Sequence, residues 1–283
     1  MNNIGLILEG GGMRGAFTAG VLDYFMERGL FLPDIYGVSA GACQACSYLA
    51  GQKGRGLRVW TEYVSDRRYM SLYSLVTTGD LIGADFNYNL VPNQLDPLDY
   101  AEEHRRPHRF TAVVTNVETG QAEYPLVEDM KRDVSWVRAS ASLPLISRIV
   151  PIDGGKYLDG GIADSIPLAR SIADGHRRNV AILTREAGYR KSPNRAMALV
   201  KLRYARYPKF VEAMATRHER YNAALDLIRA EQAAGRAFVL RPDRAPDIGR
   251  VEKDPAKLRA LHDEGWAVAK REFDRLAGFL SDH

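Results

Sequence analysis

Short apolar runs alternate with helical patterns over the first fifty residues. Residues 4–8 and 34–38 are apolar runs of strand length, and each leads into a glycine-rich turn. Residues 16–28 and 40–50 carry apolar side chains at helical spacing, with a glycine after each segment as a stop signal. This order of strand, helix, strand and helix predicts a parallel sheet covered by helices.

The strand pattern returns after an intervening segment of different character. Residues 53–108 are polar, rich in tyrosine and helical in places, which is typical of an insertion over a sheet. The expected fold is therefore α/β, with three layers, α/β/α, around a mostly parallel central sheet. Beyond the insertion, the pattern predicts a helix at 167–173 and strands at 110–117, 122–127, 149–152, 156–158 and 180–184.

The character of the chain changes again near residue 190. Residues 195–232 are basic and helical in pattern, 238–241 predict a late strand, and 256–280 predict a long amphipathic helix. The sequence shows no internal repeat and no low-complexity linker. We expect one α/β domain over residues 1–190 and a helical C-terminal extension over residues 191–283 packed on it.

Composition and charge narrow the class of protein. Of 283 residues, 46% are hydrophobic, which is enough for one large core. The net charge is +4, but residues 185–236 hold 12 Lys or Arg against 5 Asp or Glu, a local +7 that leaves the rest at −3. This local excess predicts either a solvated helical face or contact with an anionic surface such as a membrane, and we expect no nucleic-acid partner.

The cysteines and the absence of long apolar runs bear on location. Cys43 and Cys46 are the only cysteines, so a disulfide framework is excluded, and we expect both to pack as small hydrophobic residues rather than act as a redox pair. The sequence has no run of about 18 apolar residues, the length that predicts a membrane span. No secretory signal is visible. We therefore expect a cytoplasmic protein, peripheral to the membrane at most.

Gly37-Val38-Ser39-Ala40-Gly41 places a serine between a predicted strand and a predicted helix. Gly-x-Ser-x-Gly at such a junction is the nucleophile elbow, in which small neighbours let the hydroxyl project from the edge of the sheet. The helix that follows directs its positive end toward the serine. An ordinary helix N-cap is the alternative for Ser39, but the preceding strand favours the nucleophile.

The first predicted strand ends in Gly-Gly-Gly-Met-Arg-Gly at 10–15. This spacing also fits a dinucleotide-binding turn, which needs an acidic residue at the end of the second strand. Asp34 stands at the start of that strand, however, and Ser39 at its end. Consecutive glycines expose backbone N–H groups and favour an oxyanion hole, which faces Ser39 if the two strands are neighbours. The arginine of the loop has an alternative role in a surface ion pair.

A serine nucleophile needs a proton acceptor, and two Asp-Gly-Gly turns offer one. Asp153 lies between two short apolar runs, where Asp-Gly is typical of a hairpin turn. Asp159 follows a strand and leads toward a helix, a place where catalytic residues often lie. None of the six histidines stands beside a recognisable catalytic turn, so we favour Asp159 as the base.

These blocks, in this order, resemble the patatin-like phospholipases, and the segment 139–144, Ala-Ser-Ala-Ser-Leu-Pro, is similar to a further block of that family. The resemblance covers roughly residues 4–185. One departure is Ser165, where relatives often have Asn. The resemblance implies a Ser–Asp dyad, with Ser39 as nucleophile and Asp159 as general base. It also implies an oxyanion hole and supporting glycines, with these residues: Gly10, Gly11, Gly12 and Arg14 in the hole, and Gly37, Gly41, Gly160 and Gly161 in support.

The resemblance further implies hydrolysis of lipid carboxylic esters, by a phospholipase A, lysophospholipase or esterase activity, with no metal and no cofactor. The tyrosine-rich insertion at 53–108 is expected either to line the entrance for the acyl chain or to serve ordinary packing. Two other functions stay open at this point. One is nucleotide binding through the glycine loop, and the other is a regulatory member of the family without activity.

Overall fold

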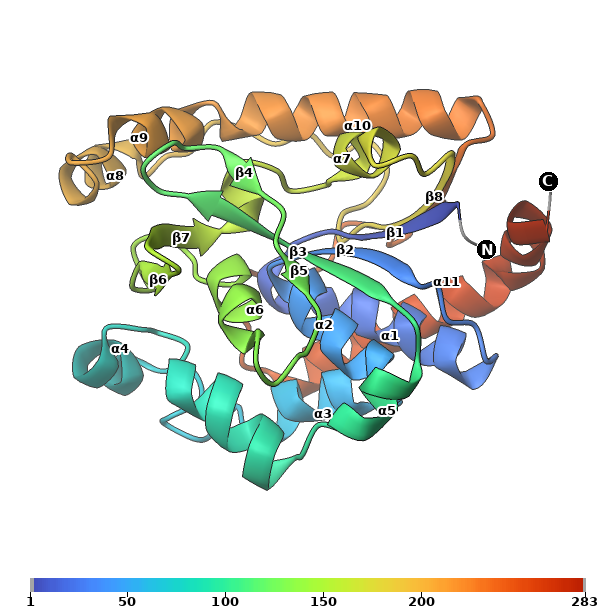
Figure 1. Cartoon of the computed structure of the whole chain (residues 1–283), viewed down its shortest axis with the longest axis horizontal. Helices are drawn as coiled ribbons and strands as arrows, with labels where there is room; N and C mark the ends of the chain where they lie inside the picture. Colours follow the sequence, from blue (N-terminus) through green and yellow to red (C-terminus); the bar gives the residue numbers. More distant parts are fainter. Residues whose placement is uncertain (1–2, 282–283) are drawn as a thin grey trace.

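A nine-stranded sheet runs through the middle of the molecule (Figure 1). The computed structural model describes residues 3–281. The strands on the main path follow the order β6-β7-β3-β2-β1-β8-β9, and β4 and β5 both pair with β3. The strand bounds are β1 Ile4–Leu8, β2 Asp34–Val38, β3 Arg109–Asn116, β4 Ala122–Glu123, β5 Leu126–Val127, β6 Val150–Ile152, β7 Gly155–Asp159, β8 Arg178–Ile182 and β9 Ala237–Leu240.

The centre of the sheet is parallel and one end of it is antiparallel. Strands β3, β2, β1, β8 and β9 run in the same direction. Strand β7 pairs with β3 in the opposite direction and forms a hairpin with β6. The expected neighbourhood of the first two strands is confirmed, because Leu8 at the end of β1 pairs with Gly37 near the end of β2. The loops that follow these two strands therefore lie at one edge of the sheet.

Helices cover both faces, which confirms the three-layer α/β/α architecture. In Figure 1, α7 and α10 lie above the sheet, and α1, α2, α3 and α11 lie below it. The bounds are η1 Gly12–Arg14, α1 Gly15–Glu27, α2 Ala40–Leu49, α3 Arg55–Glu62, α4 Leu72–Thr78, η2 (a π-helix) Phe86–Leu95, α5 Tyr100–Arg105, α6 Val134–Ser140, η3 Gly160–Ile162, α7 Leu168–Ala173, α8 Met197–Arg203, α9 Pro208–Ala215, α10 Arg217–Ala233 and α11 Pro255–Ser281.

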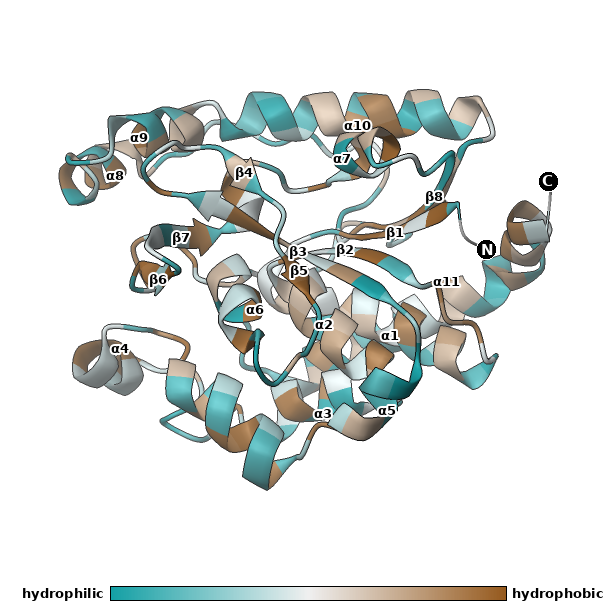
Figure 2. Cartoon of the chain, in the orientation of Figure 1, coloured by the Kyte–Doolittle hydropathy of each residue, from teal (hydrophilic) through white to brown (hydrophobic). Residues whose placement is uncertain are grey.

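The two faces of the sheet bury separate hydrophobic cores. Side chains alternate along a strand, so Leu6 and Leu8 of β1 join the larger core, between the sheet and α1 and α2, while Ile7 joins the core between the sheet and α10. In Figure 2, hydrophobic residues make up much of β1 and β7, while hydrophilic residues recur along α10. Burial on both faces explains why the central strands read as continuous apolar runs in the sequence.

The C-terminal part of the chain is built into the same layers. Strand β9 extends the sheet in parallel beside β8, and α11 packs so closely along α1 that a Cβ on Gly20 would overlap the backbone at His262. The His262 ring also makes a 2.8 Å contact with Asp23 of α1. The division at residue 190 stays a prediction, while its second part contributes a strand and core contacts as well as helices.

Candidate active site

Ser39 occupies the tight turn between β2 and α2. Its backbone has φ 54° and ψ −120°, a strained conformation for a residue with a side chain. The turn needs its glycines: a Cβ on Gly41 would overlap the Leu8 carbonyl, and one on Gly37 would stand 2.7 Å from the Cα of Ala42. The strained turn and small neighbours are the geometry of a nucleophile elbow.

The Ser39 side chain is hydrogen-bonded to Asp159 at the end of β7. Its Oγ donates to Oδ2 of the carboxylate at 2.6 Å. The other carboxylate oxygen accepts the Gly161 N–H at 2.8 Å, and the Thr115 hydroxyl donates to the Asp159 carbonyl at 2.9 Å. Only 5% of Ser39 and 2% of Asp159 are exposed. The structure thus brings the two residues together in a buried, oriented pair.

Burial dominates the electrostatics of Asp159. Loss of solvent raises the pKa of its carboxyl above the ordinary aspartate value. The Ser39 hydroxyl, the Arg217 guanidinium and the Gly161 N–H oppose this shift by stabilising the charged form. A carboxylate with a raised pKa is a stronger proton acceptor than a solvated one, which suits it to the role of a base.

The segment 139–144 holds both members of the pair in position. The Ser39 N–H donates to the Ser140 hydroxyl at 2.8 Å, and the Asp159 N–H donates to the Ser142 carbonyl at the same distance. The sequence similarity marked this segment without giving its residues a role. Their contacts show that it connects the turn after β2 with the end of β7.

The glycine loop lies directly against the nucleophile. A Cβ on Gly10 would stand 3.0 Å from the Cβ of Ser39, and Gly12 has φ +58°, a conformation that favours glycine. Within residues 3–281, the backbone N–H groups of Gly11 and Gly12 have no hydrogen-bond acceptor. Free N–H groups beside a serine hydroxyl are what an oxyanion hole requires.

Arg14, the arginine of this loop, is buried. Only 7% of the residue is exposed, and in the described part of the chain its Nε has no hydrogen-bond partner. Burial, together with the positive charge of Arg185, lowers the pKa of its guanidinium. This placement is inconsistent with the alternative of an exposed surface ion pair.

The two Asp-Gly-Gly turns differ as expected. Asp153 is exposed at the tip of the β6–β7 hairpin with φ 48°, which confirms the hairpin interpretation. At the second turn, a Cβ on Gly160 would overlap the Val113 carbonyl of β3, so only glycine permits this close approach of the two backbones. The sequence did not predict this contact between the turn and β3.

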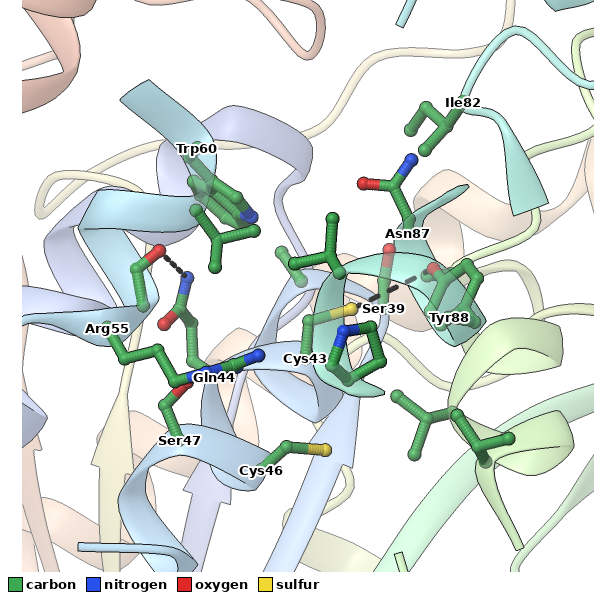
Figure 3. Close-up of a pocket in the computed structure, with 18 of the residues that line it drawn as sticks. Ser39, Cys43, Gln44, Cys46, Ser47, Arg55, Trp60, Ile82, Asn87 and Tyr88 are labelled. Carbon is green, nitrogen blue, oxygen red and sulfur yellow. Dashed lines mark hydrogen bonds between the residues drawn. The ribbon is translucent and has the colours of Figure 1, made fainter. Parts of the chain in front are cut away.

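A largely apolar cleft opens on one side of Ser39. It lies between α2 and the insertion at 53–108. Figure 3 shows Cys43 and Cys46 projecting into it from α2, with Trp60 of α3 and Tyr88 of η2 on the opposite walls. Aromatic residues of the insertion thus line a cavity at the serine.

The cysteines are consistent with packing rather than redox chemistry. Burial raises the pKa of the Cys43 thiol to about 11 and raises that of Cys46 as well. Both thiols are free, and the Cys43 Sγ contacts the Tyr88 hydroxyl at 3.9 Å. A redox cysteine needs a stabilised thiolate, which this environment opposes.

A second, smaller and polar cavity opens on the other side of Ser39. The glycine loop, Ser39 and Asp159 form part of its wall. Five basic side chains line the remainder: Arg14, Arg185, Lys191, Arg217 and Arg250. All of them except Arg14 lie outside every motif singled out in the sequence. Three of them, Arg185, Lys191 and Arg217, belong to the basic stretch 185–236 noted in the sequence, which did not indicate that they face a cavity.

Arg217 of α10 also supports the second Asp-Gly-Gly turn. Its Nε donates to the Gly161 carbonyl, which also accepts the Ser165 hydroxyl at 2.6 Å. Ser165, the departure from the family pattern, therefore remains in the hydrogen-bond network around Asp159. Its shorter side chain meets the turn together with an arginine from the C-terminal part.

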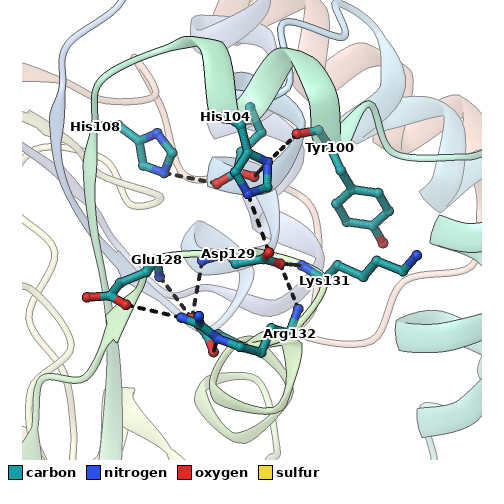
Figure 4. Close-up of polar contacts among 9 residues, drawn as sticks. Tyr100, His104, His108, Glu128, Asp129, Lys131 and Arg132 are labelled. Atoms are coloured by element: carbon teal, nitrogen blue, oxygen red, sulfur yellow. Dashed lines mark hydrogen bonds and ion pairs between the residues drawn. The ribbon is translucent and has the colours of Figure 1, made fainter.

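The histidines belong to other contacts. Figure 4 shows His104 between the Tyr100 carbonyl and Asp129, and the His108 ring lies 3.2 Å from buried Glu103. The Tyr100 carbonyl and Glu103 raise the pKa of His104. None of the histidines in residues 3–281 lines either cavity, and His283 lies outside the described residues.

Fold and site together define a class: an α/β/α protein with a strained serine on a strand–helix turn, next to a buried aspartate. The chain belongs to the patatin-like phospholipase family, whose model matches residues 6–171. A second model, a domain of unknown function named DUF6363, matches residues 207–281. This membership places the chain among lipid ester hydrolases at the level of the family.

Two relatives and one solved structure illustrate the similarity. Uncharacterized protein YjjU of Escherichia coli K12 is 34% identical over 191 residues, which are 64% of this chain and 52% of YjjU. Lysophospholipase NTE1 of Mycosarcoma maydis is 26% identical over 187 residues, 64% of this chain and 10% of that protein. The crystal structure of VipD from Legionella pneumophila has a TM-score of 0.48 and 14% identity, covering 97% of this chain and 67% of VipD. The match therefore spans about half the length of YjjU.

Two further observations concern membranes and metals. Among the helices of residues 3–281, none combines the length and apolar character needed to cross a bilayer. Across the same residues, no group of three or more His, Cys, Asp or Glu side chains is arranged to hold a metal ion.

Proposed function

We propose that this protein is a serine acyl hydrolase that cleaves lipid carboxylic esters with a Ser39–Asp159 dyad. The observation that carries this proposal is the 2.6 Å hydrogen bond from the strained, buried Ser39 hydroxyl to a carboxylate whose pKa is raised by burial. Hydrolysis of an ester series of increasing chain length by the wild type and by Ser39→Ala tests it.

The reaction begins when the Ser39 Oγ attacks the ester carbonyl carbon and passes its proton to Asp159. The oxyanion that forms lies beside the free N–H groups of Gly11 and Gly12, with the positive charge of Arg14 behind them. As the tetrahedral intermediate collapses, the alcohol leaves with the proton from Asp159, and an acyl-serine remains.

Water completes the cycle. Asp159 removes a proton from a water molecule, and the resulting hydroxide adds to the acyl carbonyl. The second tetrahedral intermediate releases the carboxylic acid, and the Ser39 oxygen recovers the proton. These steps use only groups of the dyad and the glycine loop.

We place the acyl chain in the apolar cleft. Cys46 lies seven residues beyond Ser39 in the chain and lines the cleft two helical turns from it, about 10 Å along α2 at the usual helical rise. Cys46→Met is expected to shift the kcat/KM preference several-fold toward shorter acyl chains, whereas Cys46→Ala shifts it toward longer ones. A set of p-nitrophenyl esters of different chain length measures this preference in both variants. A shift in the same direction in both would place the acyl chain outside this cleft.

We also place the membrane-facing surface at the end of the molecule that carries α4 and α8, which lie at the same end of its longest axis (Figure 1). Leu72 and Val76 of α4 are 73% and 85% exposed, and Leu202 of α8 is 78% exposed. Lys201 and Arg203 accompany these apolar side chains on α8. Apolar side chains flanked by cations suit an anionic lipid surface.

Leu199→Ser combined with Leu202→Ser is therefore expected to weaken binding to anionic vesicles several-fold. Cosedimentation with vesicles of phosphatidylglycerol and phosphatidylcholine measures this effect. Ile172→Ser, a change at an exposed apolar residue on α7, is the matched control and leaves binding unchanged. Equal loss in both variants would place the contact surface away from α8.

A further inference from the structure

The wall of the polar cavity beside Ser39 holds five basic side chains and two carboxylates, those of Glu9 and Asp159. Two neighbouring basic residues on the outer surface are paired: Arg190 contacts Asp226 at 2.8 Å, and Arg236 contacts Glu231. In the described part of the chain, the cations that line the cavity form no ion pair with a carboxylate. These cations come from both parts of the sequence: Arg14 and Arg185 from the first, and Lys191, Arg217 and Arg250 from the second.

The two acidic residues of the cavity wall accept hydrogen bonds from groups other than the cations. The carboxylate of Glu9, 2% exposed, accepts the Thr184 N–H at 2.6 Å with one oxygen and the Tyr221 hydroxyl at 2.5 Å with the other. Asp159 accepts from Ser39 and Gly161. Neither carboxylate forms an ion pair with the five cations, although the charge of Glu9 opposes the lowering of the pKa of Arg14 and Lys191, and that of Asp159 does so for Arg217. Two carboxylates against five basic groups leave an excess of positive charge.

The cations repel one another in this arrangement. Lys191 lies with its Nζ 4.1 Å from the centre of the Tyr221 ring. Burial and the charges of Arg217 and Arg250 lower the pKa of its ammonium group to about 7. Arg14 is more than nine-tenths buried, and its Nε has no partner in residues 3–281. An anion that enters the cavity relieves this repulsion and satisfies these donors.

The position of the cavity relates it to the reaction. It shares Ser39, Gly12, Leu143 and Arg250 with the apolar cleft, so the two spaces meet at the serine hydroxyl. If the acyl chain occupies the apolar side, the alcohol side of the scissile ester points toward the cations. This step rests on the proposed function.

We propose that the cavity lined by Arg14, Arg185, Lys191, Arg217 and Arg250 is a binding site for a phosphate group, supplied by the alcohol part of an ester substrate. Several guanidinium and ammonium groups around one small space suit the oxygens of a phosphate, which accepts bonds in several directions. A single carboxylate offers fewer acceptor sites than five cations require. Because three of these side chains follow residue 190, the C-terminal part helps to select the substrate.

Binding is tested first without turnover. Inorganic phosphate and glycerol 3-phosphate are titrated calorimetrically into Ser39→Ala and into the same protein with Lys191→Gln. We expect both probes to bind Ser39→Ala and to lose affinity roughly tenfold with Lys191→Gln, the usual effect of removing one hydrogen bond to a charged group. Arg190→Gln in the same background is the matched control, since Arg190 pairs with Asp226 outside both cavities.

Hydrolysis then distinguishes a substrate phosphate from free phosphate. The ratio of kcat/KM for a 1-acylglycerol 3-phosphate to that for the monoacylglycerol with the same chain is expected to fall roughly tenfold in Lys191→Gln and to stay constant in Arg190→Gln. Loss of phosphate binding with an unchanged ratio would assign the site to free phosphate instead.

The remaining outcomes separate this proposal from the catalytic one. Absence of phosphate binding to Ser39→Ala, or binding that Lys191→Gln leaves intact, overturns the phosphate site. Intact binding in a wild-type protein that hydrolyses neither ester overturns the proposed activity and retains the phosphate site. Thermal unfolding of each variant verifies that the protein is folded.

Discussion

Ser39→Ala is expected to reduce ester hydrolysis to background, a loss on the order of 10⁴–10⁶-fold in kcat. The variant removes the atom that forms the acyl intermediate, while the turn and the contacts of the Ser39 backbone remain. A fluorophosphonate probe is expected to label the wild type at Ser39 and to leave the variant unlabelled. Mass spectrometry of the labelled peptide identifies the site.

Ser135→Ala is the matched control, since Ser135 lies on α6 and lines neither cavity. It is expected to retain full activity and labelling. Turnover of p-nitrophenyl esters at the same rate by the wild type and Ser39→Ala would assign any hydrolysis to another group. The chain would then be a binding or regulatory member of its family, the alternative that the motifs alone left open.

Asp159→Asn is expected to lower kcat about 10²–10⁴-fold, the usual contribution of a general base. Asparagine keeps the shape of the side chain and can accept the Gly161 N–H, but it cannot take the serine proton. The matched control is Asp153→Asn in the other Asp-Gly-Gly turn, where asparagine tolerates the positive φ of 48°. It is expected to retain activity, and equal loss in both variants would contradict the assignment of the base.

Asp159→Asn is also expected to change how the stability of the protein depends on pH. Burial raises the folded-state pKa of Asp159, so the folded protein holds this proton more tightly than the unfolded chain does. Stability from this group is full below the unfolded pKa and is lost as the pH rises through the folded pKa. The free energy of unfolding of Asp159→Asn should therefore gain on that of the wild type as the pH rises through that range. Urea unfolding at several pH values measures the free energy of unfolding of Asp159→Asn minus that of the wild type. This signed difference is expected to increase with rising pH, and a decrease would contradict the shift.

Asp159 and Ser39 are held in unfavourable states by contacts from neighbouring elements. A buried carboxylate costs folding free energy, and the turn of Ser39 adds backbone strain of roughly 1–3 kcal/mol. The contacts from Ser140, Ser142 and Thr115 hold both residues in place from neighbouring elements. Stability given up at two positions thus provides an oriented pair that needs little rearrangement before reaction.

The C-terminal part changes how the site is understood. The family model covers residues 6–171, yet Arg217 and Arg250 reach the cavity from beyond it. Arg217 also holds the Gly161 carbonyl. Helix α11 and strand β9 fix this part to the sheet and to α1.

Local rules made most of the framework predictable. The first strands, the elbow at Ser39 and the glycine loop each depend on residues close in sequence, where periodicity and glycine chemistry are direct signals. Helix α6 was not predicted, because its seven residues include valine, serine and tryptophan, which favour a helix weakly. Its packing against β3 and β7, rather than its propensity, stabilises it. The π-helix η2, with Pro92 inside, likewise gave no recognisable pattern.

The sequence by itself determined the two turns at the ends of neighbouring strands and named Asp159 as the candidate partner of Ser39. Only the tertiary structure decided that these residues, 120 positions apart, meet at 2.6 Å. That contact depends on the antiparallel pairing of β7 with β3, which no local pattern encodes. The sequence likewise does not show that the five basic side chains meet at one cavity, because a charged residue gives the same pattern whether it faces solvent or a cavity. The packing of α10 and the neighbouring C-terminal segments against the sheet brings Lys191, Arg217 and Arg250 to the cavity, where Arg14 and Arg185 arrive from the segments that follow β1 and β8.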